Sequence, residues 1–455
     1  MKRMLAMLLC ALLALALLPA VPAAAADVPA WLEGLPDGAQ SLCEELYQDY
    51  GCVLHAGGNV RASELESGGA YTFADDTLLI LDADLRVKAL CAVGGLTIRG
   101  DACLTAEILY ACWDAPICVE SGTIVCPVMD DPPQPGKIVQ NGLCGLGGVV
   151  IEGGSVRCPV ISGCGELVAV TGGTVRTDDI HAILGYYQSG GEVEAGSVWG
   201  REGVSVSGGT LTAGRICGMN ASFTGGVITA DAVETEWGEV LIRFPMAITE
   251  PENGQYLGGA FVDADGNPVS RVRIERLEIP VPFTDVSAQG YYYDPMLWAI
   301  YTGVTKGVSE TRFAPERECT RAEAVTFLWR AFGCPEPERT DLKFADVAPG
   351  AWYADAVRWA VERGVTLGTS EAAFSPNKCC TRAEIVTLLW RSAGSPDGGA
   401  HFDGFADVPA GAWFAGAVDW AAGYGVTNGT SDTAFSPDLP CTRAQIVTFL
   451  YRLFN

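Results

Sequence analysis

The sequence predicts a multidomain protein: an all-β domain resembling a parallel β-solenoid (β-helix), followed by an α-helical region of three repeats. Two observations predict this fold class. Glycine doublets recur about every 18 residues in the middle of the chain, which is typical of one solenoid coil per repeat. A longer pattern with helical periodicity recurs three times at a spacing of 61 residues towards the C-terminus. The 455 residues are enough for two to four domains.

The first 26 residues resemble a signal peptide. Lys2 and Arg3 precede an apolar run over residues 4–18, and small residues follow up to Ala26. The apolar run is shorter than the roughly 20 residues of a membrane-spanning helix, and no later stretch is long enough either. We therefore expect a secreted protein without a membrane span. The chain ends at Asn455 without a hydrophobic tail or sorting signal, so we expect non-covalent anchoring.

The mature chain is expected to begin with two β-rich parts. Residues 27–56 are predicted to form a cap segment, helical over 39–50, that closes the open end of a solenoid over residues 57–240. The glycine doublets of the solenoid each precede a short alternating strand; they are Gly153-Gly154, Gly172-Gly173, Gly190-Gly191, Gly208-Gly209 and Gly225-Gly226. A β-sandwich with hairpins at this spacing is the alternative.

A connector over residues 241–282 is predicted to contain two or three strands. Asp265-Gly266 is typical of a hairpin turn between residues 260–262 and a strand from Val269 onward. The prolines at 280 and 282 indicate a stiff linker into the helical region.

The three C-terminal repeats are residues 283–343, 344–404 and 405–455. Each begins with Phe-x-Asp-Val and is predicted to contain two helices joined by a loop. The second helix starts with a capping box, Thr-Arg-Ala-Glu, at 320–323 and at 381–384. The third repeat has Gln445 in place of the glutamate, which still suits a capping box. A cysteine precedes each of these threonines, at positions 319, 380 and 441, and is interpreted as a small buried apolar residue.

The charge balance excludes some partners. The chain has 29 basic and 55 acidic residues and a net charge of −26, which disfavours binding to nucleic acid and to anionic lipid. Residues 283–455 carry 14 basic and 20 acidic side chains, whereas residues 27–282 carry 13 and 35. An anionic ligand is therefore more compatible with the C-terminal third, provided that a local basic site holds it.

Cysteine usage is compatible with disulfides but not with zinc. The chain has 17 cysteines, and Cys43 with Cys52 is the pairing that we favour in an exported protein. It has three histidines and no paired Cys-x-x-Cys motif, so we expect no metal and no cofactor.

The arginine of each Thr-Arg-Ala motif suggests an anion site. Arg321, Arg382 and Arg443 occupy the first turn of a predicted helix, where a positive charge opposes the helix dipole. An anion held jointly by the arginine and the helix start would explain their recurrence. The alternative is a structural pairing of each arginine with the aspartate of Phe-x-Asp-Val.

These segments resemble S-layer homology domains through Phe-x-Asp-Val, the Trp352-Tyr353 pair, Gly-Val-Thr-x-Gly, Phe-x-Pro and Thr-Arg-Ala-Glu. The resemblance implies a pseudo-threefold prong at the cell wall that binds a pyruvylated secondary cell-wall polysaccharide of a Gram-positive-type envelope. It implies that the arginines hold the carboxylate and that the aspartates either accept hydrogen bonds from sugar hydroxyls or brace the groove. It also implies that the glycines let the backbone approach the sugar. The tryptophans would stack on sugar rings, unless they form the floor of the groove. These residues are Arg321, Arg382, Arg443, Asp285, Asp346, Asp407, Gly307, Gly368, Gly429, Trp352 and Trp413.

The repeats depart from one another. The first has Tyr291-Tyr292 for Trp-Tyr, and the third has Gln445 and, in its first helix, Gly416. The second repeat matches the family pattern best, which makes Arg382 the first candidate.

The function of the solenoid stays open. One hypothesis is a non-catalytic surface domain for adhesion or glycan binding. Another is a wall-tethered carbohydrate-active enzyme, a lyase or hydrolase, and a third is a structural lattice subunit. Neighbouring carboxylates such as Asp178-Asp179 point to opposite faces of a strand, so no catalytic residue is predicted and we favour the non-catalytic hypothesis.

Overall fold

The computed structural model describes Tyr47 and residues 51–112, 115–127, 142–257, 259–338, 341–396 and 404–455. The chain forms two compact units, residues 1–277 and 278–455, and each is treated by itself. The signal peptide and Cys43, and with it the predicted Cys43–Cys52 bridge, lie outside the described residues. Of the helix expected over 39–50, only Tyr47 is described, and it is helical.

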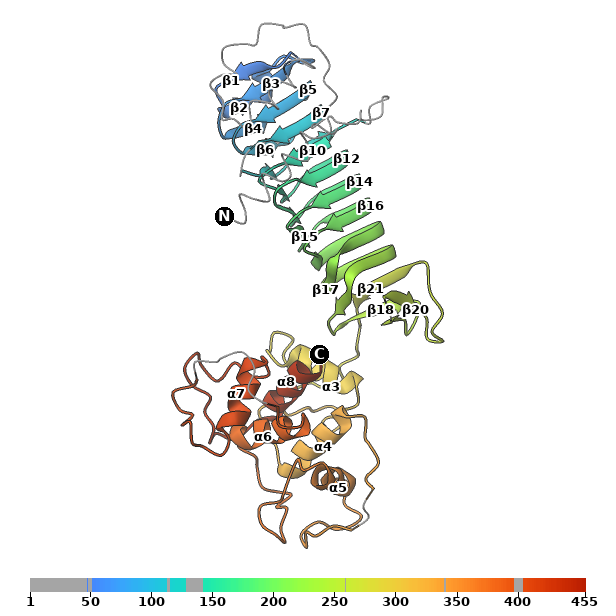
Figure 1. Ribbon diagram of the computed structural model, residues 1–455, viewed down its shortest axis with the longest axis vertical. Helices are drawn as coiled ribbons and strands as arrows, with labels where there is room; N and C mark the ends of the chain where they lie inside the picture. The colour runs from blue at the N-terminus through green and yellow to red at the C-terminus, as the bar shows by residue number, and fades with distance from the viewer. Residues whose placement is uncertain are drawn as a thin grey trace. The chain divides into compact units, whose positions relative to one another are not determined.

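The first unit is a parallel β-solenoid, as the glycine spacing predicted (Figure 1). Its strands are β1 Val53–His55, β2 Gly58–Arg61, β3 Ala70–Phe73, β4 Thr77–Leu81, β5 Leu85–Ala92, β6 Leu96–Gly100, β7 Cys103–Ala111, β8 Ile117–Val119, β9 Thr123–Val125, β10 Gly142–Gly145, β11 Val149–Ile151, β12 Ser155–Gly163, β13 Leu167–Val170, β14 Thr174–Ala182, β15 Gly185–Gln188, β16 Glu192–Gly200 and β17 Val204–Ile242. A 3₁₀ turn covers Ala62–Glu64.

Each strand pairs in parallel with the strand one coil further on. Val156 of β12 lies beside Val175 of β14, which lies beside Val193 of β16 and then Leu211 of β17. All four side chains are buried inside the coil, and their apolar surface drives the stacking. The sandwich alternative is wrong, since its hairpins require antiparallel neighbours.

The glycine doublets are corners at which the coils approach each other closely. A Cβ on Gly172 would lie 2.2 Å from the carbonyl oxygen of Glu152 in the preceding coil, and Gly173 has a φ of +73°. The first position therefore excludes any side chain, and the second favours glycine for its backbone conformation. The other four doublets share both features.

Antiparallel strands cover the C-terminal end of the solenoid. β21 (Val272–Arg276) pairs with β17 and with β18 (Met246–Glu250), while β19 (Gln255–Leu257) and β20 (Ala260–Val262) form a hairpin. The turn predicted at Asp265-Gly266 is present. The carboxylate of Asp263 stabilises it by accepting hydrogen bonds from the amides of Asp265 and Asn267. The segment predicted as a connector thus pairs directly with the last coils.

The described residues of the second unit contain two helices per repeat. They are α3 Tyr293–Tyr301 and α4 Arg321–Ala331, α5 Ala354–Glu362 and α6 Arg382–Ser392, and α7 Ala415–Gly423 and α8 Arg443–Phe454. In the second repeat, Val357 and Ala360 of α5 and Ile385, Val386 and Leu389 of α6 are buried. This arrangement confirms the helix–loop–helix prediction for each repeat.

Candidate functional site

The three repeats meet at a closed ring of backbone hydrogen bonds. The amide of Cys319 donates to the carbonyl of Cys441 (2.9 Å), that of Cys380 to Cys319 (3.0 Å), and that of Cys441 to Cys380 (2.9 Å). All three side chains are completely buried, which confirms their interpretation as small apolar core residues. Because each cysteine directly precedes a helix, the ring gathers the starts of α4, α6 and α8.

Each of these helices starts with the predicted capping box. In α6 the hydroxyl of Thr381 accepts from the amide of Glu384, and the Glu384 carboxylate accepts from the amide of Thr381. The same exchange occurs in α4, and in α8 with Gln445 as the partner. The box holds the first helical turn, and with it the arginine, in a defined position.

The three arginines are buried and reach across to the next repeat. Their Nε atoms donate to main-chain carbonyls in a cyclic order: Arg321 to Phe374 (3.0 Å), Arg382 to Phe435 (2.8 Å), and Arg443 to Phe313 (2.9 Å). Each guanidinium also lies over the ring of the same phenylalanine. The arginines therefore join the repeats to one another through main-chain carbonyls.

The pairing of arginine with the Phe-x-Asp-Val aspartate is wrong for all three motifs. Asp346 accepts from the amides of Phe374 (2.9 Å) and Ser375 (2.7 Å), and Asp285 and Asp407 accept in the same way in their own repeats. Burial raises the pKa of Asp346, but the hydrogen bonds from the two amides outweigh it and hold the pKa below its ordinary value. The aspartates thus brace the loop before each second helix.

Two of the three arginines have a carboxylate from the next repeat beside them. Arg443 Nη1 lies 3.0 Å from Glu323 Oε1, and Arg321 Nη1 lies 3.9 Å from Glu384 Oε1. These glutamates are the capping-box residues of α4 and α6. For Arg382 the corresponding residue is Gln445, an uncharged side chain.

Arg382 consequently differs from its two counterparts. Its side chain is 2% exposed, yet its Nη2 atom has no hydrogen-bond partner among the described residues. In the other two arginines, Nη2 donates to a threonine hydroxyl at 3.3 Å. Burial lowers the pKa of Arg382, and neighbours that include Tyr291 and Asp407 oppose this shift. A buried guanidinium with an unused donor favours an anionic partner.

The three turn glycines are required by packing within their own repeat. A Cβ on Gly368, whose φ is +90°, would lie 2.5 Å from the ring of Phe344 and 2.7 Å from the carbonyl of Ala373. Gly307 and Gly429 have the equivalent neighbours. The packing of the Phe-x-Asp-Val phenylalanine thus explains these glycines, whereas approach to a sugar stays a prediction.

The recurring aromatic residues are exposed. Trp352 is 62% exposed, Trp413 64% and Tyr291 61%, and each meets the next aromatic residue edge to face. They do not form a groove floor, and their rings are accessible to a ligand. Burial and Glu316 raise the pKa of Tyr291, whereas Thr442 and Arg382 oppose the shift.

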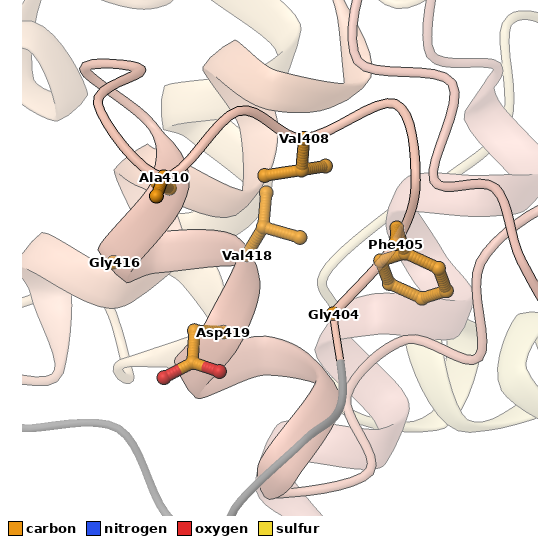
Figure 2. Close-up of a pocket in the computed structure, with 8 residues that line it drawn as sticks. Gly404, Phe405, Val408, Ala410, Gly416, Val418 and Asp419 are labelled. Atoms are coloured by element: carbon orange, nitrogen blue, oxygen red, sulfur yellow. The ribbon is translucent and has the colours of Figure 1, made fainter.

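A cavity of about 330 Å³ lies beside α7 in the third repeat (Figure 2). In the second repeat, Asp355 and Arg358 form an ion pair. The equivalent residues of the third repeat, 61 positions later, are Gly416 and Asp419, which cannot form this pair. The cavity is lined by Gly404, Phe405, Val408, Ala410, Ala415, Gly416, Val418 and Asp419. Among the described lining residues the one charged side chain is the carboxylate of Asp419, which would repel an anion.

The solenoid carries one group of potential metal ligands among the described residues. Donor atoms of Cys118, Glu120 and Glu152 lie within 4.8 Å of one another. Glu120 already forms an ion pair with Arg99, and this lowers the pKa of Glu120. The group was missed by sequence reasoning because Glu152 comes from the coil that follows that of Cys118 and Glu120.

Comparison with known proteins identifies the helical region. The S-layer homology domain family matches residues 282–325, 343–386 and 404–447. The C-terminal part of this chain carries three S-layer homology domains. They coincide with the three repeats that share the cysteine ring and the cyclic arginine contacts.

Three curated relatives illustrate where such domains occur. The chain is 32% identical over 167 residues (36% of this chain and 14% of the relative) to the surface-layer 125 kDa protein of Lysinibacillus sphaericus. It is 28% identical over 159 residues (33% and 8%) to an amylopullulanase of Thermoanaerobacterium thermosulfurigenes, and 26% identical over 153 residues (32% and 34%) to a cellulosome-anchoring protein of Acetivibrio thermocellus. The chain therefore spans a minor part of each relative.

These similarities place the protein at the cell surface. It is secreted and held at the cell wall, as predicted. Within the part of the chain that the structure describes, no helix has both the length and the apolar character needed to cross a membrane.

Sequence reasoning missed the contribution of the capping-box glutamates. They were recognised as helix caps, and Gln445 was noted only as a departure from the pattern. Their second role as counter-ions depends on contacts between repeats, so no spacing within a repeat could reveal it. The alignment of Gln445 with Glu323 and Glu384 was the signal that could have drawn attention to Arg382.

Proposed function

We propose that the three S-layer homology domains hold the protein at the wall by binding an anionic, pyruvylated secondary cell-wall polysaccharide, and that Arg382 binds its carboxylate. The observation that carries this proposal is the buried Nη2 atom of Arg382, which has no hydrogen-bond partner among the described residues. A pyruvyl ketal presents a carboxylate, whose oxygens accept charge-assisted hydrogen bonds from a guanidinium.

The three arginines are expected to contribute unequally. Arg321 and Arg443 already have a carboxylate within 4 Å, so a second anion would meet repulsion there. For Arg382 the residue equivalent to these glutamates is the uncharged Gln445, and the carboxylate of nearby Asp407 is occupied by main-chain amides. The groove at Arg382 is therefore the strongest candidate for the ligand's charged group.

Exposed aromatic side chains of the repeats would contact the sugar rings that adjoin the ketal. Tyr291, whose pKa is affected by Arg382, would contact a sugar bound beside this arginine, while Trp352 and Trp413 offer exposed rings in the other repeats. Aromatic faces provide apolar contact to sugars while their edges stay in water. Gly307, Gly368 and Gly429 would permit close approach of the backbone.

The test is sedimentation of the full-length protein with isolated cell walls. Arg382→Ala should weaken binding by at least about tenfold, because a charge-assisted hydrogen bond contributes roughly 1.5–3 kcal/mol. Arg321→Ala is the matched control, since it removes an equivalent contact between repeats from a groove that already has Glu384. Equal losses for both variants, or undiminished binding to walls stripped of the polymer, would contradict the proposal.

We further propose that the solenoid is displayed for adhesion or glycan binding. A column on its outer face supports this: His181 of β14 and Trp199 of β16 lie side by side on successive coils, with ring centroids 6.0 Å apart. Asp179 and Ser197 form a hydrogen bond beside them. Such a surface offers both ring faces and hydrogen-bonding groups to a sugar.

The test compares binding of the full-length protein and of a Trp199→Ala variant to an array of wall and host glycans. Trp237→Ala, which removes an exposed tryptophan elsewhere, is the control. Loss of binding confined to Trp199→Ala is expected. Shortening of the glycans during incubation would instead support the enzyme hypothesis.

A further inference from the structure

A stripe of four buried cysteines lies along the first solenoid coils, in a cluster separate from the main interior core. They are Cys52, Cys91, Cys112 and Cys144. The stripe forms a second apolar cluster of buried residues with Tyr110 and Ile108, against which the partly buried Cys164 packs. Cys144 of β10 belongs to the column in which Tyr110 of β7 precedes it and Ser162 of β12 follows it. Cys164 lies two residues after Ser162, diagonally across from Cys144.

The two thiols on this diagonal are in direct contact. Cys144 Sγ lies 2.9 Å from Cys164 Sγ, and the hydroxyl of Ser162 lies 3.1 Å from Cys164 Sγ. The amide of Cys164 donates to the carbonyl of Gly145 (3.1 Å), which holds the two backbones together where the coils adjoin. Little movement would bring the sulfur atoms to the bonding distance of about 2.05 Å.

We propose that Cys144 and Cys164 form a redox-reactive pair that an organic disulfide oxidises to a disulfide joining two successive solenoid coils. The proposal is independent of the anchoring function. Export favours it, because disulfides persist outside the reducing cytosol.

The environment assigns different roles to the two sulfurs. The hydrogen bond from Cys144 lowers the pKa of Cys164; burial opposes this shift and the Ser162 hydroxyl supports it. The same interaction, together with burial, raises the pKa of Cys144. Cys164 is also the more accessible of the two, with Cys144 only 7% exposed. Cys164 is therefore the attacking thiolate, and Cys144 acts second.

The exchange balances without a further reactant. The Cys164 thiolate attacks one sulfur of the organic disulfide and expels one thiolate, leaving a mixed disulfide. Cys144 then loses its proton and attacks Cys164 Sγ, which expels the second thiolate. The two protein thiols are oxidised, the organic disulfide is reduced to two thiols, and the cysteine protons end on these leaving groups.

The test uses the full-length protein equilibrated with oxidised glutathione, then alkylated, digested without reduction and analysed by mass spectrometry. We expect a linked peptide pair containing Cys144 and Cys164, which dithiothreitol separates. In the reduced protein, Cys164 should react with iodoacetamide several-fold faster than Cys217, a half-buried cysteine on the same face whose pKa burial raises. Alkylation of both cysteines after the glutathione treatment would overturn the proposal.

Two variants test the order of the steps and the joining of coils. Cys144→Ser should retain glutathione on Cys164, whereas the wild-type protein resolves it, and Cys217→Ser should behave like the wild type. Oxidation should slow hydrogen exchange in β10 and β12 several-fold. A Cys144–Cys164 disulfide that leaves hydrogen exchange unchanged would count against the joining of coils. Glutathione retained on Cys164 of the wild-type protein would count against the proposed disulfide.

Discussion

At the scale of single residues, the three arginines show how one motif acquires different chemistry. Their helix positions and Nε contacts are equivalent. The difference lies in the capping-box residue of the next repeat, which is a glutamate beside Arg321 and Arg443, whereas the equivalent position for Arg382 is Gln445. A single oxygen-to-nitrogen replacement thus decides whether the guanidinium has an internal counter-ion.

Gln445→Glu should give Arg382 a counter-ion and weaken wall binding by about tenfold, or about 1.4 kcal/mol, without loss of helix capping. The measurement is sedimentation with isolated walls, alongside thermal unfolding. Glu384→Gln is the matched control, since it removes the counter-ion of Arg321 and should not reduce binding. Wild-type binding by Gln445→Glu would show that the internal counter-ion does not decide which groove binds.

Gly368→Ala should destabilise the helical unit by about 3 kcal/mol. The new Cβ would combine a positive φ, which costs about 1–2 kcal/mol, with overpacking against Phe344, which costs about 1–3 kcal/mol. Gly364→Ala is the control, because Gly364 has a φ of +70° but a Cβ there would meet no atom within 4 Å, so it should cost only about 1 kcal/mol. Denaturant unfolding measures both, and equal losses would exclude the packing role of Gly368.

At the scale of elements, each second helix depends on a loop that an aspartate organises. In the first two repeats, burial raises the pKa of the aspartate, but the amide hydrogen bonds outweigh it and leave the pKa below its ordinary value. Such a group stabilises the fold fully above its unfolded pKa of about 3.9. The contribution disappears as the pH falls through the lower, folded value.

We therefore expect stability of the helical unit to be level at neutral pH and to fall below about pH 4. Hydrogen exchange in α6, measured across this range, reports the change. Asp346→Asn should lower stability at neutral pH, since its amide nitrogen cannot accept the second hydrogen bond, and should flatten the acid dependence. An unchanged acid slope in this variant would exclude Asp346 as a source of the pH dependence.

At the scale of the whole molecule, stability of the solenoid depends on contacts between neighbouring coils. The interior residues stack in register, and the corners bring backbone against backbone. A defect at one corner should therefore affect the adjoining coils more than distant ones.

Gly190→Ala should disturb the coils around β13, β15 and β16, because its Cβ would lie 2.2 Å from the carbonyl of Thr171. Hydrogen exchange should accelerate in these strands first. Gly238→Ala serves as the control, since a Cβ there meets no atom within 4 Å. Uniform acceleration along the solenoid would indicate that the coils unfold as one cooperative unit.

The sequence by itself determined the features that depend on local spacing. The glycine doublets predicted the coils, because each corner needs glycine for backbone reasons. The Thr-Arg-Ala-Glu motifs predicted the helix starts, because a capping box closes within four residues. The same repeated motifs were enough to predict S-layer homology domains and a location at the cell surface.

Only the tertiary structure decided which side chains act together. The counter-ions of Arg321 and Arg443 come from other repeats, Asp346 binds amides rather than an arginine, and Cys144 meets Cys164 across two coils. A hydrogen bond or ion pair depends on a separation of a few ångströms. For residues that are tens of positions apart in the chain, the packing of repeats and coils sets this separation, and no pattern within one repeat contains it.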